Sequence, residues 1–213
     1  MHKISCSTWQ YRKYEIEDII PRIAEIGYSG IEIVAHRLDV GYHLSLNFSK
    51  ERIQKIKELL NSYEIKVVAI SPACDFLKPI YGSLKADIEH IKKMTDLAAE
   101  FEASIIRPFA TNVKPKGLKR EKALKIIIDS LKECTEYAQQ YGIKVALENH
   151  GTFPNLFENL WAIIEGVNSD YFGITYHTGR TEGETSIDGQ FKKFVKKIYH
   201  VHLADWKRKA PPV

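Results

Sequence analysis

Short apolar runs rich in β-branched residues alternate along the chain with longer stretches whose apolar residues recur at helical spacing. The short runs predict seven strands: Lys3–Ser7, Gly30–Val34, Val67–Ser71, Ser104–Phe109, Lys144–Glu148, Phe172–Tyr176 and Ile198–Leu203. The stretches between them predict helices that each bury one face. Strands that alternate with helices are typical of a parallel sheet, so the pattern predicts an α/β fold.

Helix boundaries are marked by residues that cap helices. Ile19, Ile23 and Ile26 follow helical spacing and stop at Gly27, which is suited to the left-handed conformation that ends many helices. Ser49 precedes the segment KERIQKIKELL, where its hydroxyl can accept a hydrogen bond from the first turn. These signals predict where the helices begin and end.

No low-complexity segment or flexible linker divides the chain, which predicts one domain over residues 1–213. Two architectures repeat βα units: the open doubly wound sheet and the closed barrel. The first predicted strand is followed by no Gly-rich phosphate-binding turn, which speaks against a nucleotide-binding sheet. In a barrel, functional groups lie at the carboxyl ends of many strands.

Polar residues do lie at or near the ends of several predicted strands. They are Glu32, Ser71, Arg107, Glu148, His177 and His202. This distribution predicts a (β/α) TIM-type barrel. The seventh predicted strand lies only a few residues before the end of the sequence, so the barrel is expected to lack its eighth βα unit.

Composition narrows the possible partners. The 213 residues are 44% hydrophobic with a formal net charge of +4, and Lys and Arg are interleaved with acidic residues rather than clustered. We therefore expect no nucleic-acid partner. The chain has no signal-peptide pattern and no apolar run that could cross a membrane, which predicts a cytoplasmic protein without a membrane partner.

Two predicted strands end in side chains that suit a metal or a polar ligand. Glu148 ends the apolar run Val-Ala-Leu-Glu-Asn-His, and a carboxylate there needs a metal, a substrate hydroxyl or a neighbouring Arg or Lys. His200 and His202 are two residues apart on a strand and so point to the same side, near the carboxylate Asp205. Tyr199, with its alternate neighbours, is expected to point to the opposite, apolar side.

Further candidates lie on or just after the second, fourth and sixth predicted strands. His177 is a suitable metal ligand, and Arg180, three residues later, can bind a carboxylate or phosphate. Arg107 can grip an anionic or hydroxylated substrate, or it can neutralise Glu148. Glu32 lies between two isoleucines and is expected to point into the barrel toward Arg107, as a structural ion pair.

Aromatic residues fall in the loops after the first three predicted strands. They are Trp9, Tyr11, His36, His43 and Phe76. Rings in these positions can cover the apolar face of a sugar and exclude water, although loop aromatics are also common packing residues.

Five motifs, taken in order, resemble the xylose-isomerase-like superfamily of TIM barrels, which includes sugar-phosphate isomerases and epimerases. They are Gly-Tyr-Ser-Gly-Ile-Glu-Ile, Ile-Ile-Arg-Pro-Phe-Ala, Val-Ala-Leu-Glu-Asn-His, Ile-Thr-Tyr-His-Thr-Gly-Arg and His-Val-His-Leu-Ala-Asp, at the second and the fourth to seventh predicted strands. The resemblance covers nearly the whole chain.

In many members of this superfamily a divalent metal is held by a Glu, an Asp, a His and a Glu after strands five to eight. The resemblance implies Glu148 and His202 as ligands, with His177 in place of the Asp and no counterpart of the last Glu. The implied cofactor is a divalent ion such as Mn, Zn, Mg or Co. Glu148 is also the implied catalytic residue, and Arg107, Arg180 and His200 are the predicted substrate-binding residues.

The resemblance implies a metal-dependent isomerase or epimerase that moves a proton on a small sugar, sugar phosphate or hydroxy-carbonyl compound. A two-base epimerisation would need a second acid, because only one of the usual pair of Glu residues is present. One alternative is a barrel without catalysis that binds a sugar or anion through Arg107 and Arg180. Another is a barrel completed by a partner chain, for example in a homodimer. Endonuclease IV, a further member, is not favoured, because Ser-Pro-Ala-Cys stands where its zinc-binding histidine is needed.

Overall fold

Seven parallel strands form the centre of the protein in a computed structural model that describes residues 4–36, 43–112, 114–154, 156–178 and 193–204. The strands are β1 (Ser5–Ser7), β2 (Gly30–Ala35), β3 (Lys66–Pro72), β4 (Ile105–Ile106), β5 (Lys144–Glu148), β6 (Phe172–His177) and β7 (Ile198–His202). They form one sheet in chain order, which confirms the predicted parallel α/β architecture. β4 is shorter than predicted because Pro108, just beyond it, has no N–H to continue the ladder.

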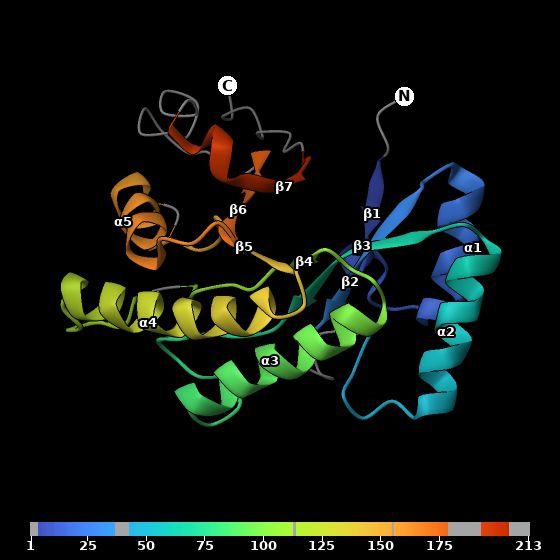
Figure 1. The fold of residues 1–213 in the computed structure, drawn as a ribbon, viewed down its shortest axis with the longest axis horizontal. Helices are drawn as coiled ribbons and strands as arrows, with labels where there is room; N and C mark the ends of the chain where they lie inside the picture. The colour runs from blue at the N-terminus through green and yellow to red at the C-terminus, as the bar shows by residue number, and fades with distance from the viewer. Residues whose placement is uncertain (1–3, 37–42, 113, 155, 179–192, 205–213) are drawn as a thin grey trace, which may run out of the picture.

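Among the described residues, five α-helices follow one another around the outside of the sheet (Figure 1). They are α1 (Ile16–Ile26), α2 (Lys50–Ser62), α3 (Leu84–Glu100), α4 (Arg120–Gln139) and α5 (Phe157–Val167). The described part of the chain also has two short 3-10 helices in connections, η1 (Thr8–Tyr11) and η3 (Val195–Lys197). None of the helices in the described ranges is both long enough and apolar enough to cross a membrane.

The predicted caps and helix faces are largely confirmed. Gly27 ends α1 with φ 98°, in the left-handed region, and the Ser49 hydroxyl accepts a hydrogen bond from Arg52 N at the start of α2. Ile19 and Ile23 are fully buried, as expected. The prediction was wrong for Ile26, which is 64% exposed because it lies at the edge of the buried face in the last turn of α1.

The core has an outer and an inner part. A large apolar cluster fills the space between the strands and the surrounding helices. A small second cluster, formed by Ala69, Ile105 and Ala146 with the Tyr199 ring against it, lies on the opposite face of the strands. The two alanines of this inner cluster leave room within the curved sheet for larger polar residues nearer the strand ends.

A bulge in β7 overturns one prediction. The pairing of β6 with β7 slips at Tyr199, so this residue and His200 both face inward, whereas strict alternation would have turned Tyr199 outward. The Tyr199 ring lies over Gly173, where an added Cβ would come within 2.6 Å of the ring and 2.3 Å of Lys197 O. Only glycine fits at this close approach. Val201 and Leu203 are 45% and 78% exposed.

The sheet curls far enough to bring its second and last strands together. Glu32 on β2 lies within hydrogen-bonding distance of His200 and His202 on β7, although the two strands are five places apart in the sheet. This is the curvature of a barrel. Within the described residues, β1 and β7 form its edges and no eighth strand is present.

Candidate functional site

A cavity of about 1000 Å³ extends along the inner face of the sheet, from Ile4, Tyr28 and Val68 near the amino ends of the strands to the polar residues at their carboxyl ends. Its polar lining includes Ser7, Glu32, Arg107, Glu148, His177 and His202. Parallel barrels bind their ligands at this end. Residues that are scattered over the sequence therefore share one candidate site.

Arg107 joins two buried carboxylates inside this cavity. Its Nε and Nη2 donate to Glu32 Oε2 and Oε1, both at 3.1 Å, and its Nη1 donates to Glu148 Oε2. The three side chains are at most 4% exposed. Burial works to raise the pKa of Glu32, but Arg107 and the two histidines hold that pKa well below its usual range. Burial likewise works to lower the pKa of Arg107, and the two carboxylates raise it instead.

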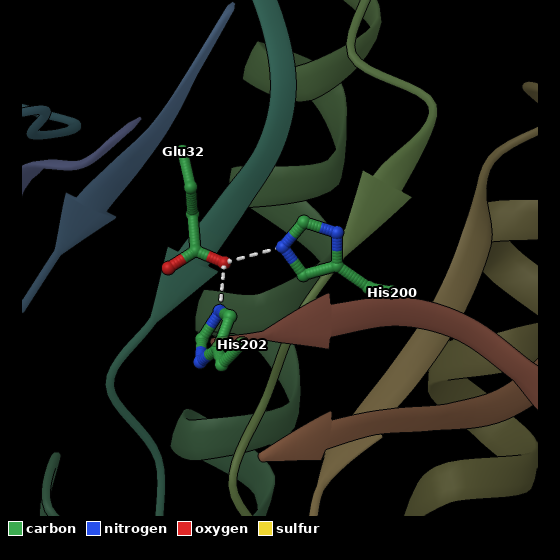
Figure 2. Close-up of side chains that lie close together, drawn as sticks. All are labelled: Glu32, His200 and His202. Atoms are coloured by element: carbon green, nitrogen blue, oxygen red, sulfur yellow. Dashed lines mark hydrogen bonds and ion pairs between the residues drawn. The ribbon is translucent and has the colours of Figure 1, made fainter. Parts of the chain in front are cut away.

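Two imidazoles approach the same oxygen of Glu32, as Figure 2 shows. His200 Nε2 lies 3.2 Å and His202 Nε2 lies 2.8 Å from Glu32 Oε2. The Ser7 hydroxyl donates to the other oxygen at 3.0 Å. Glu32 is thus bound by side chains from β1, from the residue after β4 and from β7, which makes it the centre of the polar cluster.

His202 also faces Glu148 on its other side. Its Nδ1 lies 3.6 Å from Glu148 Oε2, and its ring centroid lies 5.6 Å from that of His177. Asn149, which is fully buried, accepts a hydrogen bond from the backbone N–H of His177 at 2.8 Å. That bond helps to fix the end of β6, and with it the position of His177.

Two sets of side chains could each hold a metal ion. In the first, Glu148, His177 and His202 offer ligand atoms that all lie within 4.8 Å of one another; in the second, Glu32, His200 and His202 do so. One carboxylate oxygen and two imidazole nitrogens form a donor set that suits zinc, manganese, iron or cobalt, with a coordination position left for water or substrate. The residues present therefore fit a divalent ion.

Aromatic and imidazole rings line another part of the cavity. The centroids of Trp9 and His36 are 5.4 Å apart, those of His36 and Phe109 5.6 Å, and those of Phe109 and His150 4.6 Å. Burial and then the positive charge of Arg107 lower the pKa of His36 to about 4, so this imidazole is neutral near pH 7. Within the described residues, His36 Nε2 is buried without a hydrogen-bond partner.

Comparison with known proteins identifies the family. The family model described as "Xylose isomerase-like TIM barrel" matches residues 20–212. The chain belongs to this family. The resemblance inferred from the strand-end motifs is therefore confirmed, as is the predicted fold.

Individual relatives of this xylose-isomerase-like barrel are distant. The uncharacterized protein MJ1311 of Methanocaldococcus jannaschii is 26% identical over 95% of this chain and 70% of its own length. The crystal structure of the IOLI protein with a zinc atom superposes with a TM-score of 0.76 at 22% identity, over 94% of this chain and 72% of that chain. The 3-keto-D-glucoside 4-epimerase YcjR from E. coli gives a TM-score of 0.77 at 18% identity, over 96% of this chain and 80% of that chain. At these identities the structural likenesses establish the fold alone.

The cavity of this xylose-isomerase-like barrel contains most of the predicted site residues. Glu148, His177 and His202 come together as expected. Arg107 reaches the cavity, but its Nε, Nη1 and Nη2 are all directed at carboxylates, as in the neutralising role considered for it. His200, which was predicted to bind substrate, lines the cavity, and its Nε2 lies 3.2 Å from Glu32 Oε2. Arg180 and Asp205 lie outside the described residues.

The loop aromatics divide between the cavity and the core. Trp9 and His36 line the cavity. Phe76 is buried in the outer cluster, and His43 Nδ1 lies 2.9 Å from Thr8 Oγ1, where it helps to hold the loop after β1. Sequence reasoning missed Ser7 and Asn149. Asn149 lies within the motif Val-Ala-Leu-Glu-Asn-His and Ser7 ends the first strand, but nothing in the local pattern indicates the partner of either residue.

Proposed function

We propose that this protein is a metal-dependent isomerase or epimerase that moves a proton on a small sugar or hydroxy-carbonyl compound. The observation that carries the proposal is the convergence of Glu148, His177 and His202 in one cavity at the carboxyl ends of the strands. A zinc atom in the IOLI structure and the epimerase activity in the name of YcjR support it.

The three side chains would hold the ion and leave space for substrate beside it. A divalent cation in this place would polarise a substrate carbonyl and make the neighbouring C–H more acidic. Glu148 is the base that we assign to that proton. Arg107 keeps the Glu148 carboxylate close to a fixed positive charge, and Asn149 holds the backbone of His177 in place.

The number of carboxylates bears on the type of reaction. Proton transfer between neighbouring carbons on one face of an enediol needs a single base, whereas inversion at one carbon needs a second group on the opposite face. Glu32, the other carboxylate of the cluster, is held ionised by Arg107 and the histidines, which lower its pKa. Among the described residues, the cluster therefore favours isomerisation over two-base epimerisation.

The proposal is tested by metal content and by proton exchange. Elemental analysis of the purified protein is expected to give one divalent ion per chain after supplementation, and less in His202→Asn, because His202 belongs to both sets of side chains that could hold an ion. The supplemented protein is then incubated in D₂O with a panel of short aldoses and ketoses, and loss of the C–H signal next to the carbonyl is followed by proton NMR. Exchange that disappears in Glu148→Gln supports the assigned base.

A second function is favoured by the charge balance of the cluster. Arg107 neutralises much of the charge on Glu32 and Glu148 without any metal, as expected of a barrel that only binds a sugar or anion. Retained sugar binding with no proton exchange, with and without added metal, would favour this alternative. A sugar phosphate as ligand and a homodimer as the assembled form remain predictions, to be tested by ligand titration and by analytical ultracentrifugation.

A further inference from the structure

Glu32 Oε2 is a point on which two imidazole nitrogens converge (Figure 2). His200 and His202 both present Nε2 to this oxygen, at 3.2 and 2.8 Å. The Glu32 side chain is 2% exposed, whereas both histidine side chains are 16% exposed and line the cavity. An ion could therefore reach these nitrogens from the cavity.

The spacing of these atoms is close to that of a metal centre. Zinc lies about 2.0–2.2 Å from oxygen and nitrogen ligands, which places tetrahedral ligand atoms about 3.4 Å apart. The separation of 3.2 Å between Glu32 and His200 nearly matches this value. The separation of 2.8 Å between Glu32 and His202 must open by about half an ångström, a small side-chain movement.

His202 is shared with the Glu148 set, but through its other nitrogen. Nε2 faces Glu32 Oε2 at 2.8 Å, and Nδ1 faces Glu148 Oε2 at 3.6 Å. A neutral imidazole has one N–H and one nitrogen with a lone pair, so it binds a metal through only one nitrogen. The remaining N–H is then oriented by a carboxylate, as is common for metal-binding histidines.

From this geometry we infer that Glu32, His200 and His202 form a second divalent-cation position, which is filled only when the Glu148, His177 and His202 position is empty. The tautomer of His202 decides between them. When Nε2 binds the ion, Nδ1–H is directed at Glu148; when Nδ1 binds it, Nε2–H is donated to Glu32. The inference shares His202 with the proposed function, and the experiment below separates the two.

The charge of the cluster independently limits it to one ion. Glu32, Glu148 and Arg107 together carry one net negative charge, and all three are buried. One dication would leave one net positive charge, and two dications would leave three. Because uncompensated charge in a buried site costs several kcal/mol, double occupancy is strongly disfavoured. Arg107 contacts the carboxylate of each position, Glu32 in one and Glu148 in the other, so its positive charge does not favour one position over the other.

The test is a titration with Co²⁺, whose visible d–d absorption reports binding without any substrate. Four proteins are compared: the parent, His177→Asn, His200→Asn and the double variant. The parent and both single variants are expected to bind one equivalent, with a Kd that rises only about twofold in a single variant if the two positions bind equally. The double variant is expected to bind at least tenfold more weakly than either single variant.

The nitrogen that binds the ion gives a second readout. With Zn²⁺, the ring nitrogen shifts of ¹⁵N-labelled His202 are expected to show Nε2 bound in His177→Asn and Nδ1 bound in His200→Asn. The single variants leave Glu32, Arg107 and Glu148 intact, and circular dichroism checks that they fold. Because both are histidine-to-asparagine changes on neighbouring strands, each is the matched control of the other.

The outcomes distinguish this inference from the proposed function. If the parent binds one equivalent, His177→Asn binds none and His200→Asn is unchanged, the second position is refuted and the proposed metal site stands. If the parent binds no Co²⁺, the metal requirement of the proposed function fails together with the inference. One equivalent in His177→Asn that is lost in the double variant supports the second position.

Discussion

Arg107→Met would remove the cation that contacts both Glu32 and Glu148. Three of its N–H groups donate to these carboxylates, and the side chains involved are at most 4% exposed. Removing one partner of a buried ion pair costs about 3–5 kcal/mol, because a charge is left buried without compensation. Since Arg107 has two partners, we expect a loss of about 4–5 kcal/mol in the free energy of unfolding at pH 7, near the top of that range.

Thermal and urea unfolding measure this loss. For a chain of this size, 1 kcal/mol corresponds to about 2–4 °C in Tm, so the variant is expected to melt about 10–20 °C below the parent. Arg107→Lys is the matched control, because it keeps the positive charge but loses the forked geometry. We expect it to lie between the parent and Arg107→Met.

The pH dependence shows whether charge is the cause. In the parent, the folded-state pKa of Glu32 is well below 4.5, so its contribution to stability is present above pH 4.5 and is lost as the pH falls toward the folded-state pKa. In Arg107→Met, burial without the cation raises this pKa, and the carboxyl takes up a proton as the pH falls from 7 to 5. The difference in free energy of unfolding between the parent and Arg107→Met is therefore expected to become smaller as the pH falls from 7 to 5.

A divalent ion should compensate in part for the missing guanidinium. Addition of Co²⁺ is expected to raise the Tm of Arg107→Met more than that of the parent. Two results would refute the view that Arg107 holds two ionised carboxylates together. One is a loss in the free energy of unfolding of Arg107→Met smaller than about 1 kcal/mol at pH 7, and the other is a difference in that free energy between variant and parent that does not change between pH 7 and 5.

Three further predictions concern other parts of the barrel. Gly173→Ala is expected to cost about 1–3 kcal/mol in urea unfolding, because the new Cβ meets the backbone at Lys197, whereas the control Gly166→Ala meets only the Ile128 side chain and should cost less. The pKa of His36 is lowered from 6.5 to about 4, so the free energy of unfolding should fall by about 2–3 kcal/mol as the pH drops through that interval. Thermal unfolding of His36→Gln at the same pH values should lack this part of the pH dependence. Ser49→Ala removes the cap of α2 and should lower stability by about 1 kcal/mol, and a calorimetric Tm equal to that of the parent would contradict this role.

Most of the fold could be predicted from local patterns, because strand and helix periodicity depends on which face of each element is buried. All seven strands lie where apolar runs predicted them, and the caps at Gly27 and Ser49 follow from local backbone chemistry. The errors arise where local pattern and packing differ. Ile26 keeps helical spacing but lies at the rim of the buried face, and Tyr199 breaks the alternation of its strand because of a bulge.

The candidate site divides in the same way. The sequence by itself determined the family and the residue types at the strand ends, because parallel strands present their carboxyl ends at one edge. Only the tertiary structure decided that Glu32 is the centre of the cluster, since it meets His202 across 170 residues through the curvature of the sheet. The bulge at Tyr199 and the two faces of the His202 ring likewise depend on register and side-chain geometry, for which periodicity along a single strand carries no signal.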